Sequence, residues 1–177
     1  GNEPETIGGG CLSGCGHTFK RLWQITILRQ IRSVSIALPQ KQFYTSEDYW
    51  NLPEDQRAEL IDGKLYAMAP PSPFHQELVM EISAVIHSHI KSKAGNCKVY
   101  PSPLAVNLNA DDKIWVEPDI SIICDTSRID SQGCKGAPDW IIEIVSPSST
   151  RMDYFVKLFK YRTAGVREYW IVNPMKK

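Results

Sequence analysis

The sequence predicts an α/β domain in which a mixed central β-sheet is flanked by helices. Three observations lead to this class: an amphipathic helical pattern over residues 74–93, a series of short β-prone runs after it, and a second helical pattern over residues 150–164. Hydrophobic residues make up 42% of the 177-residue chain, which is enough for a core and excludes wholesale disorder. No apolar run approaches the roughly 20 residues that span a bilayer, so no membrane partner is expected.

The first helical pattern is the most regular element of the sequence. Ser72 followed by Pro73 is a favourable start for a helix, and Gly95 is a favourable end. Between them the apolar residues return at intervals of three and four positions, so they share one face that can pack on a sheet. These residues are Leu78, Ile82, Val85, Ile86 and Ile90.

A β-hairpin is predicted ahead of this helix, where Asp62-Gly63 separates two short β-prone runs. Both turn residues accept the positive φ that a tight hairpin requires. Thr45 or Ser46 can cap a short helix before the hairpin. The polar segment 124–139 is predicted to be a loop. The remaining strand-like runs are Lys98–Tyr100, Leu104–Leu108, Ile114–Val116, Ile120–Ile123, Trp140–Val145 and Tyr169–Val172.

The second helical pattern runs from Thr150 to about Ala164, and Gly165 is expected to end it. Thr150 and Asp153 have the three-residue spacing of a capping box, in which two side chains satisfy the first free N–H groups of a helix. The predicted order is helix, hairpin, helix, several strands, helix and strand. This order is typical of one mixed sheet with helices packed on it.

The charge is distributed unevenly along the chain, although the net charge is zero. Residues 1–41 carry a balance of +3 and residues 42–177 a balance of −3. A dedicated duplex-DNA binder is usually basic, because neutralising phosphates supplies much of its affinity. If residues 42–177 act on nucleic acid, the attraction must come from a local patch, a metal ion or a second subunit.

Residues 1–41 are expected to form an extension outside the domain, which we place at residues 42–177. Residues 1–18 are rich in glycine and are expected to be disordered. Residues 19–38 are apolar and basic and contain no acidic residue, and two interpretations stay open. They are an organelle-targeting segment, or upstream sequence without a role in the domain.

The five cysteines are scattered at irregular spacing. Their odd number and spacing argue against a disulfide framework, so free thiols and a cytoplasmic protein are expected. Cys11, Cys15 and His17 lie close together, but a zinc site needs four ligands and no matching pair follows nearby. No zinc is therefore expected.

Two acidic residues stand out because they lie among apolar, strand-like residues. Asp119 lies between two such runs, and Glu143 lies inside Trp140-Ile-Ile-Glu-Ile-Val145. A buried carboxylate is costly unless it is paired or bound to a cation. Two carboxylates on neighbouring strands could share one Mg²⁺, with a backbone carbonyl and waters as further ligands. The alternative is that Asp119 caps a turn and Glu143 faces solvent on an edge strand.

The order of several motifs resembles that of the Uma2 family of endonucleases, within the PD-(D/E)xK superfamily. The similarity covers residues 44–174, about three quarters of the chain. The family's pattern continues beyond the position of Lys177, so we expect the domain to lack a C-terminal segment here. The matching segments are Tyr44-Thr-Ser-Glu-Asp-Tyr-Trp, Glu59-Leu-Ile-Asp-Gly-Lys-Leu, the proline-rich loop before His75, Glu117-Pro-Asp-Ile, Trp140-Ile-Ile-Glu-Ile-Val-Ser-Pro-Ser-Ser, Asp153-x3-Lys157-x3-Tyr161 and Gly165-Val-Arg-Glu-Tyr-Trp-Ile-Val-Asn-Pro174.

This resemblance implies a restriction endonuclease-like fold and a divalent-metal site for Mg²⁺, with Mn²⁺ as a substitute. It implies Asp119, Glu143 and the backbone carbonyl of Ile144 as metal ligands. The superfamily's plain signature has lysine two residues after the second acid, where this chain has Val145. The lysine is instead assigned to Lys157 on the second helix, where it would orient the attacking water or stabilise the phosphorane charge.

Glu59 and His75 also match positions of the family. Glu59 would hold a metal-bound water or a second metal ion, and His75 would contact a phosphate or tune an acid. The alternatives are a surface acid of the hairpin and a packing role at a helix end. Lys157 has an alternative as well, because with Asp153 it has the spacing of an ordinary surface ion pair. Further candidates are Lys160 as the catalytic lysine and Glu117 as a ligand, whereas Tyr161 is assigned to core packing.

The function expected from these residues is a Mg²⁺-dependent endonuclease that hydrolyses phosphodiester bonds in DNA. Cleavage of both strands usually needs two sites, so a homodimer is expected on mechanistic grounds. The alternative is a catalytically inactive module of the same fold that binds nucleic acid or protein, since a fold does not determine a function. A nuclease acting on RNA is a third interpretation, because no residue here reads the sugar.

Overall fold

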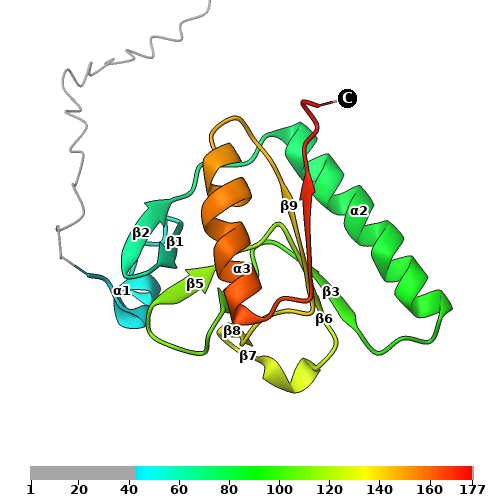
Figure 1. Cartoon of the computed structure of the whole chain (residues 1–177), viewed down its shortest axis with the longest axis horizontal. Helices are drawn as coiled ribbons and strands as arrows, with labels where there is room; N and C mark the ends of the chain where they lie inside the picture. Colours follow the sequence, from blue (N-terminus) through cyan, green and yellow to red (C-terminus); the bar gives the residue numbers. More distant parts are fainter. Residues whose placement is uncertain (1–42, 177) are drawn as a thin grey trace, which may run out of the picture. The chain divides into compact units, whose positions relative to one another are not determined.

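The computed structural model describes residues 43–176, so the extension expected at residues 1–41 lies outside the described residues. Within the described part, three α-helices and two mixed β-sheets form an α/β fold (Figure 1). The helices are α1 (Ser46–Trp50), α2 (Pro73–Ser92) and α3 (Leu158–Ala164). None of the helices in the described part is long and apolar enough to cross a membrane.

The first sheet has six strands in the order β2-β1-β5-β4-β8-β7. All neighbours are antiparallel except β4 and β8. The predicted hairpin is confirmed, and its turn residues Asp62 and Gly63 have φ of 50° and 73°. The strands are β1 (Ala58–Ile61), β2 (Lys64–Ala67), β4 (Val106–Asn107), β5 (Ile114–Val116), β7 (Ile129–Asp130) and β8 (Gly133–Lys135).

The second sheet has four strands in the order β10-β9-β6-β3. Strands β9 and β10 are parallel, and the other neighbours are antiparallel. The described strands therefore form two mixed sheets where one was expected. The strands are β3 (Lys98–Pro101), β6 (Ile120–Ile123), β9 (Trp140–Ile144) and β10 (Glu168–Val172).

The segment 124–139 is not the simple loop that its polar composition predicts. It contains a 3₁₀ turn at Thr126–Arg128 and the two short strands β7 and β8. Strand β8 pairs with β4 at a close backbone approach, where a Cβ on Gly133 would lie 2.1 Å from the carbonyl oxygen of Ala105. Glycine is required at this contact, so Gly133 marks a strand and not only a turn.

Strand β9 is buried on both faces, which explains its apolar sequence. Ile142 and Ile144 belong to the core cluster that includes Val79 of α2. Ile141 lies on the other face, in the cluster that contains Tyr161 of α3. In Figure 1, α2 and α3 accordingly lie on opposite sides of β9. Because side chains alternate along a strand, Glu143 points to the same side as Ile141, toward α3.

The second predicted helix is present, but its first turns are wider than those of an α-helix. Residues Met152–Lys157 form a π-helical segment, η2, that continues directly into α3. The capping box expected between Thr150 and Asp153 is wrong, because Asp153 is only 2% exposed and lies inside the helix. The widened segment turns Asp153 toward the protein interior, and such segments are frequent at functional sites.

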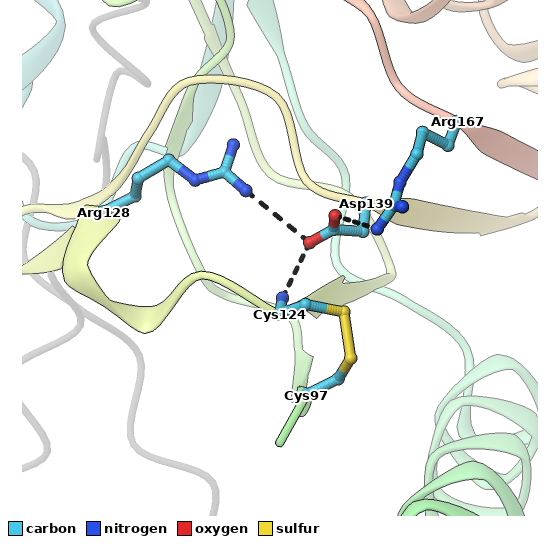
Figure 2. The surroundings of a disulfide bond; sticks show 5 residues. All are labelled: Cys97, Cys124, Arg128, Asp139 and Arg167. Atoms are coloured by element: carbon cyan, nitrogen blue, oxygen red, sulfur yellow. Dashed lines mark hydrogen bonds and ion pairs between the residues drawn. A yellow bond between two sulfur atoms is a disulfide. The ribbon is translucent and has the colours of Figure 1, made fainter. Parts of the chain in front are cut away.

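Cys97 and Cys124 form a disulfide, so the expectation of free thiols is wrong for these two residues (Figure 2). They adjoin the cross-strand pair Lys98 and Ile123 and so lie opposite each other at one end of β3 and β6. The pairing depends on which strands become neighbours, and this cannot be read from the cysteine spacing. Cys134 is free and buried, as expected of a structural thiol.

Candidate functional site

The candidate site lies between the two sheets and the helix formed by η2 and α3. Strand β9 contributes Glu143, β1 contributes Glu59, and the residue before β6 is Asp119. Glu59 is 4% exposed and Glu143 is 3% exposed, so neither is the solvent-facing acid of the alternative interpretations. The protein therefore holds several carboxylates in its interior, where each needs a donor or a cation.

Lys157 is the cation that these carboxylates surround. Its Nζ lies 2.9 Å from Glu59 Oε1 and 3.0 Å from Glu143 Oε1. Asp153 Oδ1 is 3.9 Å from the same nitrogen. Because Lys157 is only 6% exposed, its pair with Asp153 is not the surface ion pair that the spacing alone permits.

Two residues of the site were not assigned a site role from the sequence. Asp153, Lys157 and Tyr161 follow one another at intervals of four, and all three are buried on one face of the helix. Tyr161 is fully buried, and its hydroxyl donates to Glu143 Oε1 at 2.7 Å. The even spacing around Lys157 is the sequence signal that links these two residues to the site, whereas their local patterns predict a cap for Asp153 and core packing for Tyr161.

Asp119 meets the end of β9 through a short network. The Ile144 N–H donates to Asp119 Oδ2 at 2.7 Å, and the Asp119 N–H donates to Glu143 Oε2 at 3.3 Å. The antiparallel register of β6 and β9 brings these residues together, since Ile120 lies opposite Ile142. The structure thus gathers Asp119, Glu143 and the carbonyl of Ile144, the three groups that the motifs single out.

His75 completes this edge of the site from the first turn of α2. Ser72 caps that helix by accepting from the His75 N–H, as its sequence predicts. The imidazole Nε2 lies 3.2 Å from Asp119 Oδ2 and 3.1 Å from the Ile144 carbonyl oxygen. The hydrogen bond to Asp119 raises the pKa of His75, although burial opposes the rise. His75 therefore has direct polar contacts in the site and not only a packing role.

The charges of the cluster shift the pKa values of its members. Burial, together with the charge of Asp119, raises the pKa of Glu143 to about 8, while the ammonium of Lys157 opposes the rise. Burial alone would lower the pKa of Lys157, but the charges of Glu143 and Glu59 outweigh it and hold the pKa well above its usual value. Burial also raises the pKa of Asp153. The single ammonium of Lys157 therefore cannot neutralise all the buried carboxyl groups around it.

Two further candidates of the sequence lie outside the cluster. Lys160 forms an ion pair with Asp62 at 2.6 Å. The carboxylate of Glu117 accepts from the Tyr49 hydroxyl at 3.0 Å and pairs with Arg57. Only the backbone N–H of Glu117 reaches the cluster, where it donates to Glu59 Oε1. Neither Lys160 nor the side chain of Glu117 is placed to act with Asp119 and Glu143.

The donor set fits a hard divalent cation. Asp119 Oδ2 and the Ile144 carbonyl oxygen already converge on one group, His75 Nε2, and Glu143 Oε2 adjoins them through the Asp119 N–H. Carboxylate and carbonyl oxygens are the ligands that Mg²⁺ prefers. No group of three His, Cys, Asp or Glu side chains in the described part is arranged to hold a metal ion. A metal here would depend on two carboxylates and one backbone carbonyl.

Known proteins resemble this chain in both sequence and structure. The family model Uma2, described as "Putative restriction endonuclease", matches residues 42–177. A crystal structure described as "a putative nuclease belonging to DUF820", from Anabaena variabilis, is similar with a TM-score of 0.59 and 27% sequence identity. That similarity covers 73% of this chain and 74% of the other. The uncharacterized protein slr1290 of Synechocystis sp. is 27% identical over 130 residues, which are 72% of this chain and 67% of that protein.

These comparisons confirm the family that the motifs suggest and the nuclease-like α/β fold. They support a nuclease-like function in general terms, without naming a metal or the residues that act. The Uma2 match extends over well more than half of the chain and includes every residue of the acidic cluster. The chain belongs to the Uma2 family.

Proposed function

We propose that this protein is a Mg²⁺-dependent endonuclease that hydrolyses phosphodiester bonds in DNA. One observation carries the proposal. Glu143 is buried beside both Asp119 and Lys157, in a cluster that holds more carboxylates than ammonium groups. A stable core has no need of this arrangement, because apolar residues of similar volume are often as stabilising as a buried ion pair. A site that must bind a cation and a phosphodiester does need it.

Asp119, Glu143 and the Ile144 carbonyl would hold the metal ion. When bound, Mg²⁺ would polarise the phosphodiester and lower the pKa of a water. His75 Nε2 donates to two of these ligand oxygens, so it holds them close together. Deprotonated at Nε2, the same imidazole could serve as an additional ligand.

Lys157 acts in this proposal as a fixed positive charge. Its raised pKa keeps the ammonium protonated, so it cannot serve as a general base at neutral pH. Held between Glu59 and Glu143, the ammonium would stabilise the negative charge that develops on the phosphoryl oxygens and would orient the attacking water. Glu59 would in turn fix that ammonium and hold a metal-bound water.

A plasmid cleavage assay in Mg²⁺ or Mn²⁺ tests this proposal. The parent protein should cleave the plasmid, and the Asp119→Asn variant should not. Loss of one ligand charge is expected to reduce the cleavage rate at least ~100-fold, the range of a lost electrostatic group in an active site. Glu117→Gln is the matched control, because its carboxylate lies two residues away and points to Tyr49 and Arg57. Cleavage at the parental rate by Asp119→Asn would remove Asp119 from the mechanism.

A second function deserves the same assay because residues 42–177 carry a charge balance of −3. An acidic body is unfavourable for duplex binding, and it favours a module of this fold that does not cleave DNA. The two functions differ in their response to metal. A catalytic site should raise the melting temperature when Mg²⁺ is added, whereas no rise and no cleavage would support the inactive module.

A homodimer with two such sites is the form we propose for cutting both strands.

A further inference from the structure

We propose that Tyr161 determines which divalent cation the site prefers, by leaving Glu143 only one oxygen for a metal ion. The inference rests on the proposed function, because it concerns the same metal site. It assigns Tyr161 a positioning role, since its hydroxyl contacts a ligand residue and no part of a substrate. The sequence alone suggested only core packing for this residue.

The two oxygens of Glu143 have different surroundings. Oε1 accepts from the Tyr161 hydroxyl at 2.7 Å and from Lys157 Nζ at 3.0 Å. A carboxylate oxygen has two lone pairs, so two donors occupy both. Oε2 accepts only a longer bond, 3.3 Å, from the backbone N–H of Asp119. The oxygen left for a cation is therefore the one next to Asp119.

Tyr161 cannot readily release this hydrogen bond. Its side chain is completely buried, and its ring packs edge-on against Tyr169 at a centroid distance of 4.9 Å. The Tyr169 hydroxyl donates to the carbonyl oxygen of Asp153 at 2.9 Å, which ties the second ring to η2. Both donors to Glu143 Oε1 come from adjacent turns of one helix, so they hold the carboxylate in one orientation.

A carboxylate restricted to one oxygen suits one cation better than another. Mg²⁺ is small and requires a nearly ideal octahedron, to which each carboxylate contributes one oxygen. Ca²⁺ is larger and accepts carboxylates through one or both oxygens in a flexible shell. Because the Tyr161 hydroxyl occupies Oε1, Glu143 cannot coordinate Ca²⁺ through both of its oxygens. The absence of that hydroxyl should therefore change the selectivity and not only the affinity.

The experiment compares Tyr161→Phe with Tyr169→Phe, using calorimetric titration with Mg²⁺ and with Ca²⁺. Each variant removes one buried hydroxyl from the same aromatic pair, but only Tyr161 contacts a ligand carboxylate. In Tyr161→Phe the ratio of Mg²⁺ to Ca²⁺ affinity is expected to fall about tenfold, the size of one lost hydrogen bond to a charged group. In Tyr169→Phe the ratio is expected to stay within about twofold of the parent.

The possible outcomes separate this inference from the proposed function. Equal loss of Mg²⁺ and Ca²⁺ affinity in Tyr161→Phe would mean a purely structural role and would overturn the inference alone. If the parent protein binds neither ion, the metal site of the proposed function fails, and the inference fails with it. A change of the affinity ratio in both tyrosine variants would also contradict the inference. The hydrogen bond from the Tyr161 hydroxyl to Glu143 would then have no effect of its own on selectivity.

A second measurement does not depend on the folding of a tyrosine variant. Infrared spectra of carboxylate stretching bands distinguish one-oxygen from two-oxygen coordination. In the parent protein, the bands are expected to show one-oxygen coordination of Glu143 with Mg²⁺ and with Ca²⁺ alike, and Glu143→Gln identifies which bands belong to this residue. A two-oxygen signature for the parent with Ca²⁺ would overturn the inference.

Discussion

Replacing Lys157 with methionine is expected to destabilise the protein by about 3–5 kcal/mol, because it removes one partner of a buried ion pair and leaves the other without a counter-charge. Methionine preserves much of the side chain's length and removes the ammonium. Glu59 and Glu143, each within about 3 Å of that ammonium, would then remain buried beside Asp153. Urea denaturation at neutral pH measures the change, and the same variant is expected to lose all cleavage activity.

Lys160→Met is the matched control for this prediction. Lys160 lies on the same helix three residues later, but its partner Asp62 is 60% exposed in its side chain. Exposed ion pairs contribute about 0–1 kcal/mol, so this control should remain close to the parent in stability. Equal destabilisation by the two substitutions would mean that the buried cluster has no special dependence on Lys157.

The pH dependence of the Lys157→Met variant gives a further signature. Burial raises the pKa of Glu143 from 4.5 to about 8 even with Lys157 present, and the loss of Lys157 removes the opposing charge. A carboxyl whose pKa is raised on folding contributes stability below its unfolded pKa, and this contribution is lost as the pH rises through the folded pKa. Below about pH 8 Glu143 is protonated in both folded proteins, so its share of the variant's deficit should be small there and should increase as the pH rises above 8.

Replacing both Cys97 and Cys124 with serine is expected to destabilise the protein by about 3 kcal/mol, which lowers the melting temperature by about 10 °C. The bond joins residues 27 positions apart, so it restricts a long loop in the unfolded chain. It also joins β3, at the edge of its sheet, to β6, which follows Asp119.

Thermal unfolding with and without a reducing agent measures this effect in the parent protein. The reduced parent and the double variant should melt at the same temperature, while the variant should not respond to the reducing agent. A parent protein whose melting temperature is independent of reduction would contradict the prediction. The network around Asp139, which accepts from the Cys124 N–H at 2.7 Å and pairs with Arg128 and Arg167, would then suffice to hold this end of the sheet (Figure 2).

The sequence predicts those features of the structure that depend on local patterns. The helix α2 follows from its apolar period and from Ser72 at its start, and the hairpin follows from Asp62-Gly63. Asp119 and Glu143 stand out because charge is costly among apolar strand residues. Each of these signals lies within a few neighbouring positions.

Other features depend on contacts between distant parts of the chain. The strands β7 and β8 have two and three residues, too few for a periodic pattern, and they are stabilised by pairing with each other and with β4. Asp153 faces inward on the π-helical segment, where it lies 3.9 Å from the buried ammonium of Lys157. The disulfide likewise requires that β3 and β6 become neighbours. The spacing of residues along the sequence does not show which of these distant segments come into contact.

The ammonium shared by several carboxylates has a consequence for how this family can vary. Substitutions in such a cluster are not independent, because each one changes the charge that the others experience. Once Lys157 is lost, Glu59→Gln or Asp153→Asn should restore part of the stability, because each removes one buried carboxylate that has lost its counter-charge. The order in which these substitutions arise therefore decides which of them are tolerated. We expect relatives that lack the lysine to lack an acid of the cluster as well, as a compensated pair.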